Sequence, residues 1–208
     1  MFIKICGLST PETVTAAVMA GADAVGFLLA PGYPRTITPG QAAELHALVP
    51  ASVETVGVFR NQPLEVVIRS ARQPGVRAVQ LHGDEPAGDA LEIERAGFEV
   101  LRAFSAPAFA ALGRQERAFW AGKRILVDAV DPGHGVPFDA ALLDEASPEG
   151  FWLLAGGLTA SNVADLASQL RPDGVDVSSG VEESRGVKSP QLIEEFIAAA
   201  RATPPARR

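Results

Sequence analysis

The segment Met1-Phe-Ile-Lys-Ile-Cys-Gly-Leu-Ser-Thr10 sets the pattern that the rest of the chain repeats. Residues 2–6 predict a short strand, in which alternate side chains share a face. Lys4 and Cys6 are therefore expected to point the same way. Thr10 and the proline after it indicate the start of a helix, because a hydroxyl caps the first turn and a proline fits it. The segment is a strand–turn–helix unit with an amine and a thiol on one strand face.

Similar units follow along the whole chain, with no change of composition that would mark a second domain. Strands are expected at residues 2–6, 24–29, 53–59, 78–82, 99–104, 124–128, 151–155 and 174–178. Helical patterns follow them at residues 11–20, 39–49, 64–71, 86–96, 106–120, 139–146, 159–170 and 190–200. This alternation predicts an α/β fold, a single-domain (β/α)8 TIM barrel. The main alternative is an open doubly wound sheet, but no Gly-x-Gly-x-x-Gly follows the first strand.

Bulk composition restricts the classes of function. The 208 residues, 47% of them hydrophobic, suit one domain at residues 1–202 with short loops, followed by a frayed tail at residues 203–208. A net charge of -7 argues against nucleic acid or an anionic membrane as the main partner. One cysteine excludes an internal disulfide, and with three histidines it is too few for a structural zinc site. With no leader-like segment and no long apolar run, we expect a cytoplasmic protein.

Polar groups and glycines fall at the C-terminal ends of the predicted strands, where barrels of this kind place their active sites. These groups are Cys6, His82, Asp128, Gly156, Gly157, Ser178, Ser179 and Gly180, and the loop after the second strand adds Arg35. A purely structural barrel has no need to collect such groups on one rim. The pattern favours an active site at this end.

Two glycine-containing loops follow the seventh and eighth strands, at residues 155–159 and 177–181. Small residues let backbone N–H groups approach an anion closely, and these two loops are the usual phosphate site of the fold. Either loop alone could be an ordinary turn. Both together favour a phosphate site and hence a phosphorylated small-molecule substrate.

Cys6 and Asp128 each allow two interpretations. A lone cysteine is most often a small buried hydrophobe, but on a rim it can serve as a general base. Asp128 follows three apolar residues and is either a structural loop cap or the acid partner of Cys6. A base and an acid on opposite sides of a barrel mouth suit the transfer of a proton between two atoms of one substrate.

The remaining polar candidates also carry alternatives. Arg35 is either a solvated loop arginine or a planar fork for a carboxylate. Gln80 and His82 share a strand face and are either polar core residues or ligand contacts. Lys4 and Asp176 should both point into the barrel from neighbouring strands, and we expect them to pair because a buried charge needs a partner.

Five motifs, in this order and spacing, resemble phosphoribosylanthranilate isomerases of tryptophan biosynthesis over nearly the whole chain. They are Lys4-Ile-Cys-Gly7, Gln80-Leu-His-Gly83, Leu126-Val-Asp128, Ala155-Gly-Gly-Leu158 and Asp176-Val-Ser-Ser-Gly-Val-Glu182. The resemblance implies a (β/α)8 barrel without cofactor or metal. It implies the Amadori rearrangement of N-(5-phosphoribosyl)anthranilate to 1-(2-carboxyphenylamino)-1-deoxyribulose 5-phosphate.

The resemblance also implies roles for individual residues. Asp128 would be the general acid that protonates the furanose ring oxygen, and Cys6 the general base that removes the C2 proton of the sugar. Arg35 would hold the anthranilate carboxylate. Gly157, Ser179 and Gly180 would help to hold the phosphate through backbone groups. From the sequence itself, Gly156 and Ser178 in the same loops are further phosphate-binding candidates, and Gln80, His82 and Asp176 are candidates for other substrate contacts.

One loop departs from the family pattern. The family usually has a Gly-Gly-Thr/Ser-Gly run before Phe-Asp, whereas this chain has Asp131-Pro-Gly-His-Gly135 followed by Val-Pro-Phe-Asp139. That loop follows Asp128, so His134 could alter closure over the substrate or the pH dependence. We expect the reaction to be the same.

Several alternatives stay open. An epimerase of this fold would present metal ligands from several strands, and indole-glycerol-phosphate synthase would need a catalytic lysine, for which Lys4 is the only inward candidate. A second, histidine-pathway substrate would need another phosphate site in the other half of the barrel, where no matching glycine loop occurs. A non-catalytic phospholigand sensor would keep the glycine loops but has no use for the Cys6/Asp128 pair. We expect a monomer rather than a homodimer.

Overall fold

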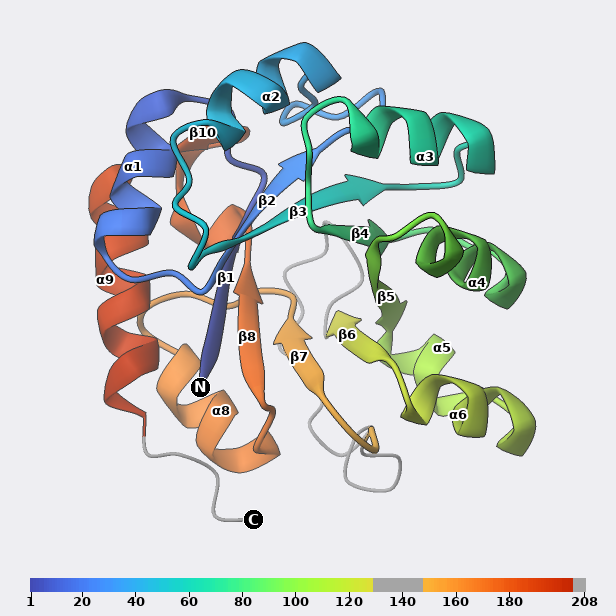
Figure 1. The fold of residues 1–208 in the computed structure, drawn as a ribbon. Coiled ribbons are helices and arrows are strands. Elements are labelled where there is room, and N and C mark those ends of the chain that lie inside the picture. Colours follow the sequence, from blue (N-terminus) through green and yellow to red (C-terminus); the bar gives the residue numbers. More distant parts are fainter. Residues whose placement is uncertain (129–147, 204–208) are drawn as a thin grey trace.

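The predicted strands close into a parallel barrel in the computed structural model, which describes residues 1–128 and 148–203 (Figure 1). The strands follow chain order, and β1 closes the barrel on β8 with Lys4 opposite Asp176. The barrel strands are β1 Phe2–Cys6, β2 Ala24–Leu28, β3 Glu54–Phe59, β4 Ala78–Leu81, β5 Glu99–Ser105, β6 Arg124–Asp128, β7 Trp152–Ala155 and β8 Gly174–Val177. The predicted single-domain (β/α)8 architecture is confirmed.

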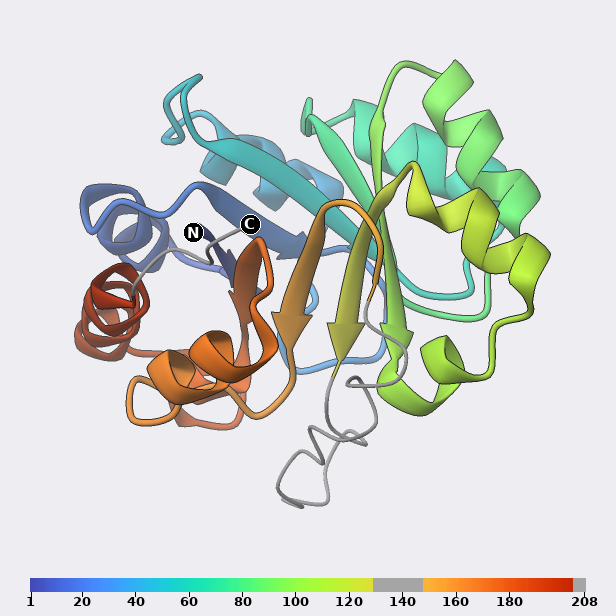
Figure 2. The same cartoon turned by 90° about the horizontal axis from the view of Figure 1, so that it is seen from below.

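The helices lie outside the strands and cover the barrel (Figures 1 and 2). They are α1 Pro11–Met19, α2 Pro39–His46, α3 Leu64–Arg72, α4 Ala87–Arg95, α5 Ala106–Ala110, α6 Arg114–Ala121, α8 Val163–Leu170 and α9 Pro190–Ala202. Thr10 caps α1 as predicted, since its hydroxyl accepts from the Thr13 N–H at 3.4 Å. Among the described residues, no helix is both long enough and apolar enough to cross a membrane.

The helical stretch predicted at residues 106–120 is divided into α5 and α6, and Arg117 accounts for the break. Its guanidinium donates to the carbonyls of Ala110 at 2.7 Å, Leu112 at 3.1 Å and Phe109 at 3.4 Å. The last carbonyls of a helix lack partners within the helix. Arg117 supplies partners at the end of α5, so this short helix ends there.

The helix α8 begins at Val163, not at Thr159 as predicted. The Asn162 side chain accepts from the Thr159 N–H at 2.8 Å and donates to the Gly157 carbonyl at 3.0 Å. These two bonds hold residues 157–162 in a turn. The first glycine loop therefore leads into this turn before the helix starts.

A hairpin that the sequence pattern did not predict follows β8. After the 3-10 turn Ser179–Val181, β9 Glu182–Ser184 pairs antiparallel with β10 Val187–Lys188. The hairpin reverses at Gly186, whose positive φ of 87° favours glycine. The loop expected at residues 129–137, which contains His134, and the helix expected at residues 139–146 lie outside the described residues. Thr203, the first residue of the expected tail, is buried, and its hydroxyl donates to the Ala199 carbonyl at 3.3 Å.

The main core lies between the barrel and its helices, and a smaller apolar filling lies inside the barrel. The inner side chains form two groups, namely Leu101, Ala103, Leu126, Leu153 and Ala155 on one side and Ala24, Val56 and Ala78 on the other. At the N-terminal end, Arg124 lies over the rings of Phe2 and Phe151 and binds Glu54 with two nitrogens, at 2.7 and 2.8 Å. Charged residues that close this end are typical of the stability face of a barrel.

Candidate active site

Lys4 and Asp176 form a buried ion pair inside the barrel, as predicted. The Lys4 Nζ donates to Asp176 Oδ1 at 2.7 Å, and the two side chains are 0% and 7% exposed. Burial alone would lower the pKa of Lys4, but Asp176 and Cys6 outweigh it and raise that pKa. Lys4 is therefore a fixed cation at neutral pH.

Cys6 lies beside this pair at the C-terminal end of β1, and its thiol is free and buried. A Cβ built on Gly26 of β2 would lie 3.0 Å from the Cys6 Sγ, so the neighbouring strand needs glycine there to make room. Burial raises the pKa of the Cys6 thiol; Lys4 and Lys188 lower it, and Asp176 raises it further, with a net upward shift. The thiolate that forms is a correspondingly strong base.

His82 lies between Gln80 and Asp128 at the barrel mouth. The Gln80 amide nitrogen lies 2.8 Å from His82 Nδ1, and His82 Nε2 lies 3.8 Å from Asp128 Oδ2. Burial lowers the pKa of His82, so the ring is neutral at pH 7. Because the amide N–H donates to Nδ1, the ring proton is on Nε2, facing the Asp128 carboxylate.

Gln80 keeps one unused acceptor at this end of β4. Its side chain is only 1% exposed, and within residues 1–128 and 148–203 its Oε1 has no hydrogen-bond partner. A buried polar atom without a partner is uncommon and costs free energy. The oxygen is therefore suited to accept a hydrogen bond from a ligand.

Arg35 is held by Glu182, a residue to which sequence analysis gave no role. Arg35 Nε and Nη2 both donate to the Glu182 carboxylate, the latter at 2.8 Å. Burial would raise the pKa of Glu182, but hydrogen bonds from Arg35, the Gly186 N–H and Lys188 lower it to about 2. Glu182 is thus an anion throughout the physiological range and fixes one edge of the guanidinium.

Lys188 is the second charged residue of the site that sequence analysis missed. Its side chain is 1% exposed, its Nζ donates to the Ser178 carbonyl at 2.7 Å and to Ser178 Oγ at 3.1 Å, and it forms an ion pair with Glu182 Oε1 at 2.9 Å. Burial lowers the pKa of Lys188, although Glu182 raises it. The ammonium group is therefore engaged by Ser178 and Glu182 within the protein.

The two glycine loops, which follow β7 and β8, lie against each other. A Cβ built on Gly180 would lie 1.8 Å from the Leu158 carbonyl oxygen, so only glycine allows this approach. Gly156 and Gly157 have positive φ angles of 90° and 63°. The backbones of the two loops are therefore in close contact, and backbone N–H groups in glycine loops of this kind can bind an anion.

Gly7 shows how Cys6 is related to Arg35 and to the second glycine loop. A Cβ built on Gly7 would lie 2.8 Å from Arg35 Cδ and 3.3 Å from Ser178 Oγ. The residue after Cys6 therefore lies between Arg35 and the second glycine loop. The described residues contain no cluster of three or more side chains placed to hold a metal.

The signal that could have revealed Glu182 and Lys188 is weak. Glu182 ends the last of the five motifs, and Lys188 is one of only three lysines in the chain. Their partners are distant in sequence: Arg35 and Glu182 are 147 residues apart. A charge pattern along the chain cannot predict such a contact.

Comparison with known proteins gives one consistent result. Residues 3–199 match the family model described as N-(5'phosphoribosyl)anthranilate (PRA) isomerase. The N-(5'-phosphoribosyl)anthranilate isomerase of Deinococcus radiodurans is 42% identical over 197 residues, which is 94% of each chain. That of Dechloromonas aromatica is 41% identical and covers 96% of this chain and 95% of the relative.

Solved structures agree with this comparison. The crystal structure of TrpF from Jonesia denitrificans has a TM-score of 0.86 and 42% identity, with 98% of each chain covered. A phosphoribosyl anthranilate isomerase in complex with reduced 1-(o-carboxyphenylamino)-1-deoxyribulose 5-phosphate has a TM-score of 0.83 and 33% identity. The match covers 97% of this chain and 98% of that one.

Proposed function

The chain belongs to the N-(5'-phosphoribosyl)anthranilate isomerase family, and we propose that Asp128 and Cys6 are the general acid and the general base of its reaction. The protein is an isomerase of tryptophan biosynthesis that interconverts an aldose and a ketose derivative. It converts N-(5-phosphoribosyl)anthranilate to 1-(2-carboxyphenylamino)-1-deoxyribulose 5-phosphate. The observation that carries the residue assignment is that a thiol and a carboxylate end β1 and β6 on the same rim, beside two anion-binding features.

The substrate phosphate is assigned to the paired glycine loops. Gly156 and Gly157 contribute from the loop after β7, and Ser178, Ser179 and Gly180 from the loop after β8. Backbone N–H groups in such loops bind a dianion without a paired side-chain cation. The close packing of Gly180 on Leu158 supports one shared site rather than two.

The anthranilate carboxylate is assigned to Arg35. Two of the five N–H bonds of its guanidinium are used by Glu182, which leaves Nη1 and the second Nη2 proton for a substrate carboxylate. Because Glu182 holds one edge of the planar guanidinium, the other edge can bind a carboxylate with little further loss of side-chain entropy. This arrangement retains the role that the sequence suggested and adds a partner that orients the group.

With both ends of the substrate anchored, the sugar lies between Cys6 and Asp128. Asp128 protonates the furanose ring oxygen, the ring opens to a Schiff base, and Cys6 removes the proton from C2 of the sugar. The resulting enolamine tautomerises to the ketone. Neutral His82 donates toward the Asp128 carboxylate left by proton transfer, and Gln80 Oε1 can accept from a sugar hydroxyl. Asp176 holds Lys4 beside the thiol, so its effect on catalysis runs through that ammonium group.

Turnover of freshly prepared phosphoribosylanthranilate, measured beside binding of the reduced product analogue, tests the function. We expect both turnover and binding. An inert protein that binds the analogue would instead be a phospholigand sensor, and one that does neither would act on another substrate. A cytoplasmic location, expected from the composition, stays a prediction.

A further inference from the structure

The β9–β10 hairpin connects the two anion-binding parts of the active site through its first and last residues. Glu182, at the start of β9, binds Arg35, and Lys188, at the end of β10, binds Ser178. The two hairpin residues also bind each other at 2.9 Å. Arg35, Glu182, Lys188 and Ser178 are thus connected by one continuous chain of hydrogen bonds and ion pairs.

The hairpin also packs directly on the loop that carries Arg35. A Cβ built on Gly186, at the hairpin turn, would lie 2.9 Å from the Pro34 Cβ. The Gly186 N–H donates to Glu182 Oε2 at 3.0 Å, so the turn and the carboxylate are held together. The contact with Arg35 is therefore supported by packing as well as by charge.

Lys188 cannot serve as an ordinary substrate-binding cation. Its ammonium group is buried, donates twice to Ser178 and pairs with the Glu182 carboxylate. Lys188 must therefore act by holding Ser178 and Glu182 in place. Because it accepts from Lys188, the Ser178 hydroxyl has its own proton free to donate.

We propose that Glu182 and Lys188 are positioning residues which fix the distance between the carboxylate-binding and phosphate-binding parts of the site. Glu182 orients Arg35 toward the anthranilate end, and Lys188 holds the Ser178 turn at the phosphate end. A substrate that carries an anion at each end is selected by this fixed separation. The inference rests on the proposed function, because that function identifies the two anions.

A double-mutant cycle tests the first half of the proposal. Glu182→Gln removes the charge with little change of shape, and Arg35→Met removes the fork. We expect Glu182→Gln to raise KM and the Kd of the reduced product analogue about tenfold, with a smaller change in kcat. The double variant should bind no more weakly than Arg35→Met alone, because Glu182 acts through Arg35. If the loss of affinity in the double variant equalled the product of the losses in the two single variants, the proposal would be contradicted.

The exposed neighbour of Glu182 provides the matched control. Glu183→Gln removes the same charge one residue along the hairpin, at an exposed position. It should leave KM, kcat and analogue binding unchanged. An equal loss in Glu183→Gln would show that general electrostatics, not positioning, explains the effect.

Lys188→Met tests the phosphate end, with inorganic phosphate as the probe. We expect weaker phosphate binding in Lys188→Met and unchanged phosphate binding in Glu183→Gln. If Lys188→Met fails to fold, Gly186→Ala replaces it, since the added methyl pushes the hairpin off Pro34 and should raise KM. An unchanged KM in Gly186→Ala would contradict the proposal. If wild type lacks turnover, the proposed function fails, but the analogue-binding cycle still tests the positioning role.

Discussion

Gly7 is the residue at which Cys6, Arg35 and the second glycine loop meet. It follows Cys6, has a φ of 75°, and lies against Arg35 and Ser178. No side chain fits in this position without moving one of them. The site therefore depends on a missing Cβ as much as on the groups that do the chemistry.

The substitution Gly7→Ala should weaken substrate binding more than it weakens the fold. The methyl group would meet Arg35 Cδ at 2.8 Å, so we expect KM to rise about tenfold. Gly32→Ala is the matched control: Gly32 has a φ of 87°, but a Cβ there meets nothing within 4 Å. Both variants carry backbone strain of about 1–2 kcal/mol, measurable by thermal unfolding. Equal KM values in the two variants would disprove the steric argument.

The raised pKa of Cys6 predicts an alkaline rise in activity. A group that must be deprotonated to act as base becomes more active as pH increases toward its pKa. We expect kcat/KM to increase with pH above neutrality. Iodoacetamide reacts with thiolates, and in this chain it reports only Cys6. The rate of alkylation should follow the same pH curve, with its midpoint at a higher pH than for an unburied cysteine. If kcat/KM did not change with pH while the alkylation rate increased, the Cys6 thiolate would not be the base of the reaction.

At the scale of elements, a buried ion pair outside the barrel joins β5 to the loop before α4. Arg102 Nη1 donates to Glu85 Oε2 at 2.6 Å, and the side chains are 7% and 3% exposed. Glu85 also accepts from the Asn61 N–H at 2.7 Å and the Gly83 N–H at 2.9 Å. This cluster fixes the backbone next to His82.

Breaking that pair should cost much more stability than breaking an exposed one. Arg102→Met leaves the Glu85 carboxylate buried without its cation, which costs about 3–5 kcal/mol in the free energy of unfolding. Arg77 binds Glu99 at 3.1 Å with both side chains exposed, so Arg77→Met should cost about 1 kcal/mol or less. Urea unfolding measures both values, and similar losses would show that the Arg102 pair is not the structural element described.

The strands, the strand-end residues and the starts of α1, α2, α3 and α9 could be predicted from the sequence, whereas the end of α5, the start of α8 and the hairpin could not. Strand bounds follow from apolar runs, and topology then places Cys6 and Asp128 on one rim whatever their partners. The end of α5 and the start of α8 involve hydrogen bonds made by one side chain each, Arg117 and Asn162. Such contacts leave no periodic pattern in the sequence, so they could not be predicted from it. The contact of Glu182 with Arg35 is of the same kind.

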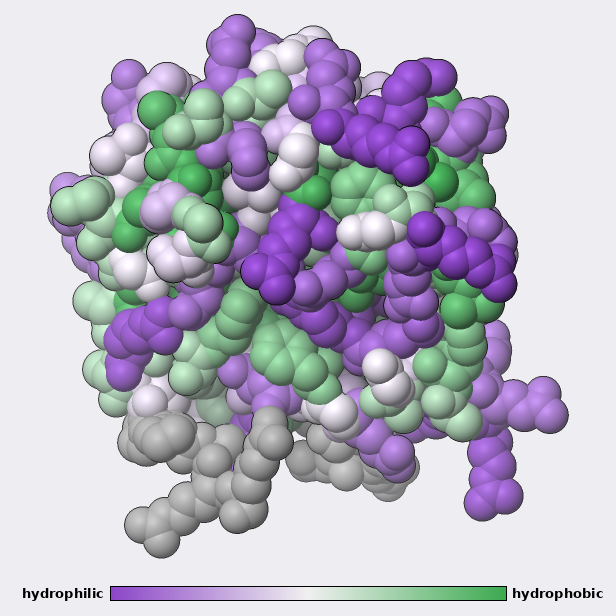
Figure 3. Space-filling model, in the orientation of Figure 1, coloured by the Kyte–Doolittle hydropathy of each residue, from purple (hydrophilic) through white to green (hydrophobic). Residues whose placement is uncertain are grey.

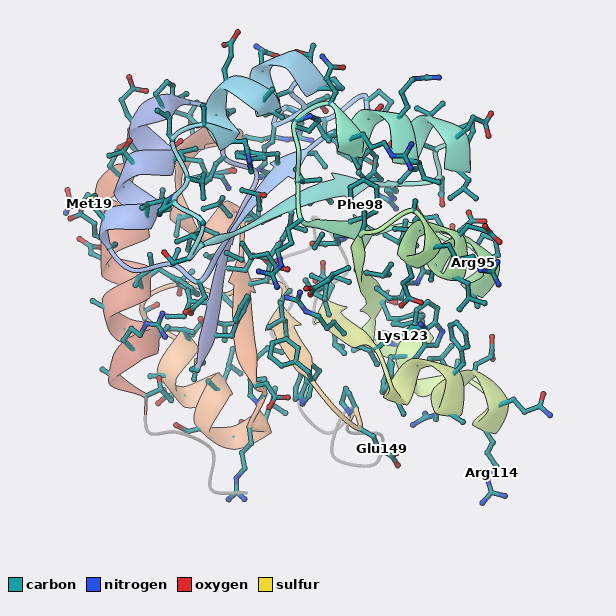
Figure 4. All side chains as sticks on the ribbon, in the orientation of Figure 1. Met19, Arg95, Phe98, Arg114, Lys123 and Glu149 are labelled. Carbon is teal, nitrogen blue, oxygen red and sulfur yellow. The ribbon has the colours of Figure 1, made fainter. Side chains whose placement is uncertain are left out.

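At the scale of the whole molecule, the described surface offers little for self-association. Among the described residues the large exposed hydrophobic side chains are Met19, Tyr33, Leu48, Leu91 and Val187, which come from separate elements. Met19 points outward from α1 (Figure 4), and the face in Figure 3 intersperses hydrophobic with hydrophilic residues. A stable interface needs a continuous patch of about 800 Å² on each partner.

We therefore predict a monomer in solution. Sedimentation should give one species near 21.7 kDa that does not change with concentration. A species of twice that mass that persists on dilution would contradict this prediction and would indicate a contact between these separate elements.

The central claim is that Cys6 and Asp128 supply the base and the acid on one barrel rim, and paired kinetics and binding test it most directly. The measurement compares kcat of wild type, Cys6→Ser and Asp128→Asn, with the affinity of each for the reduced product analogue. Loss of a positioned acid or base typically lowers the rate about 10²–10⁴-fold. We predict losses of that size in both variants with analogue affinity retained. Near-wild-type kcat in either variant would contradict the claim, and for Cys6 it would leave only a buried thiol.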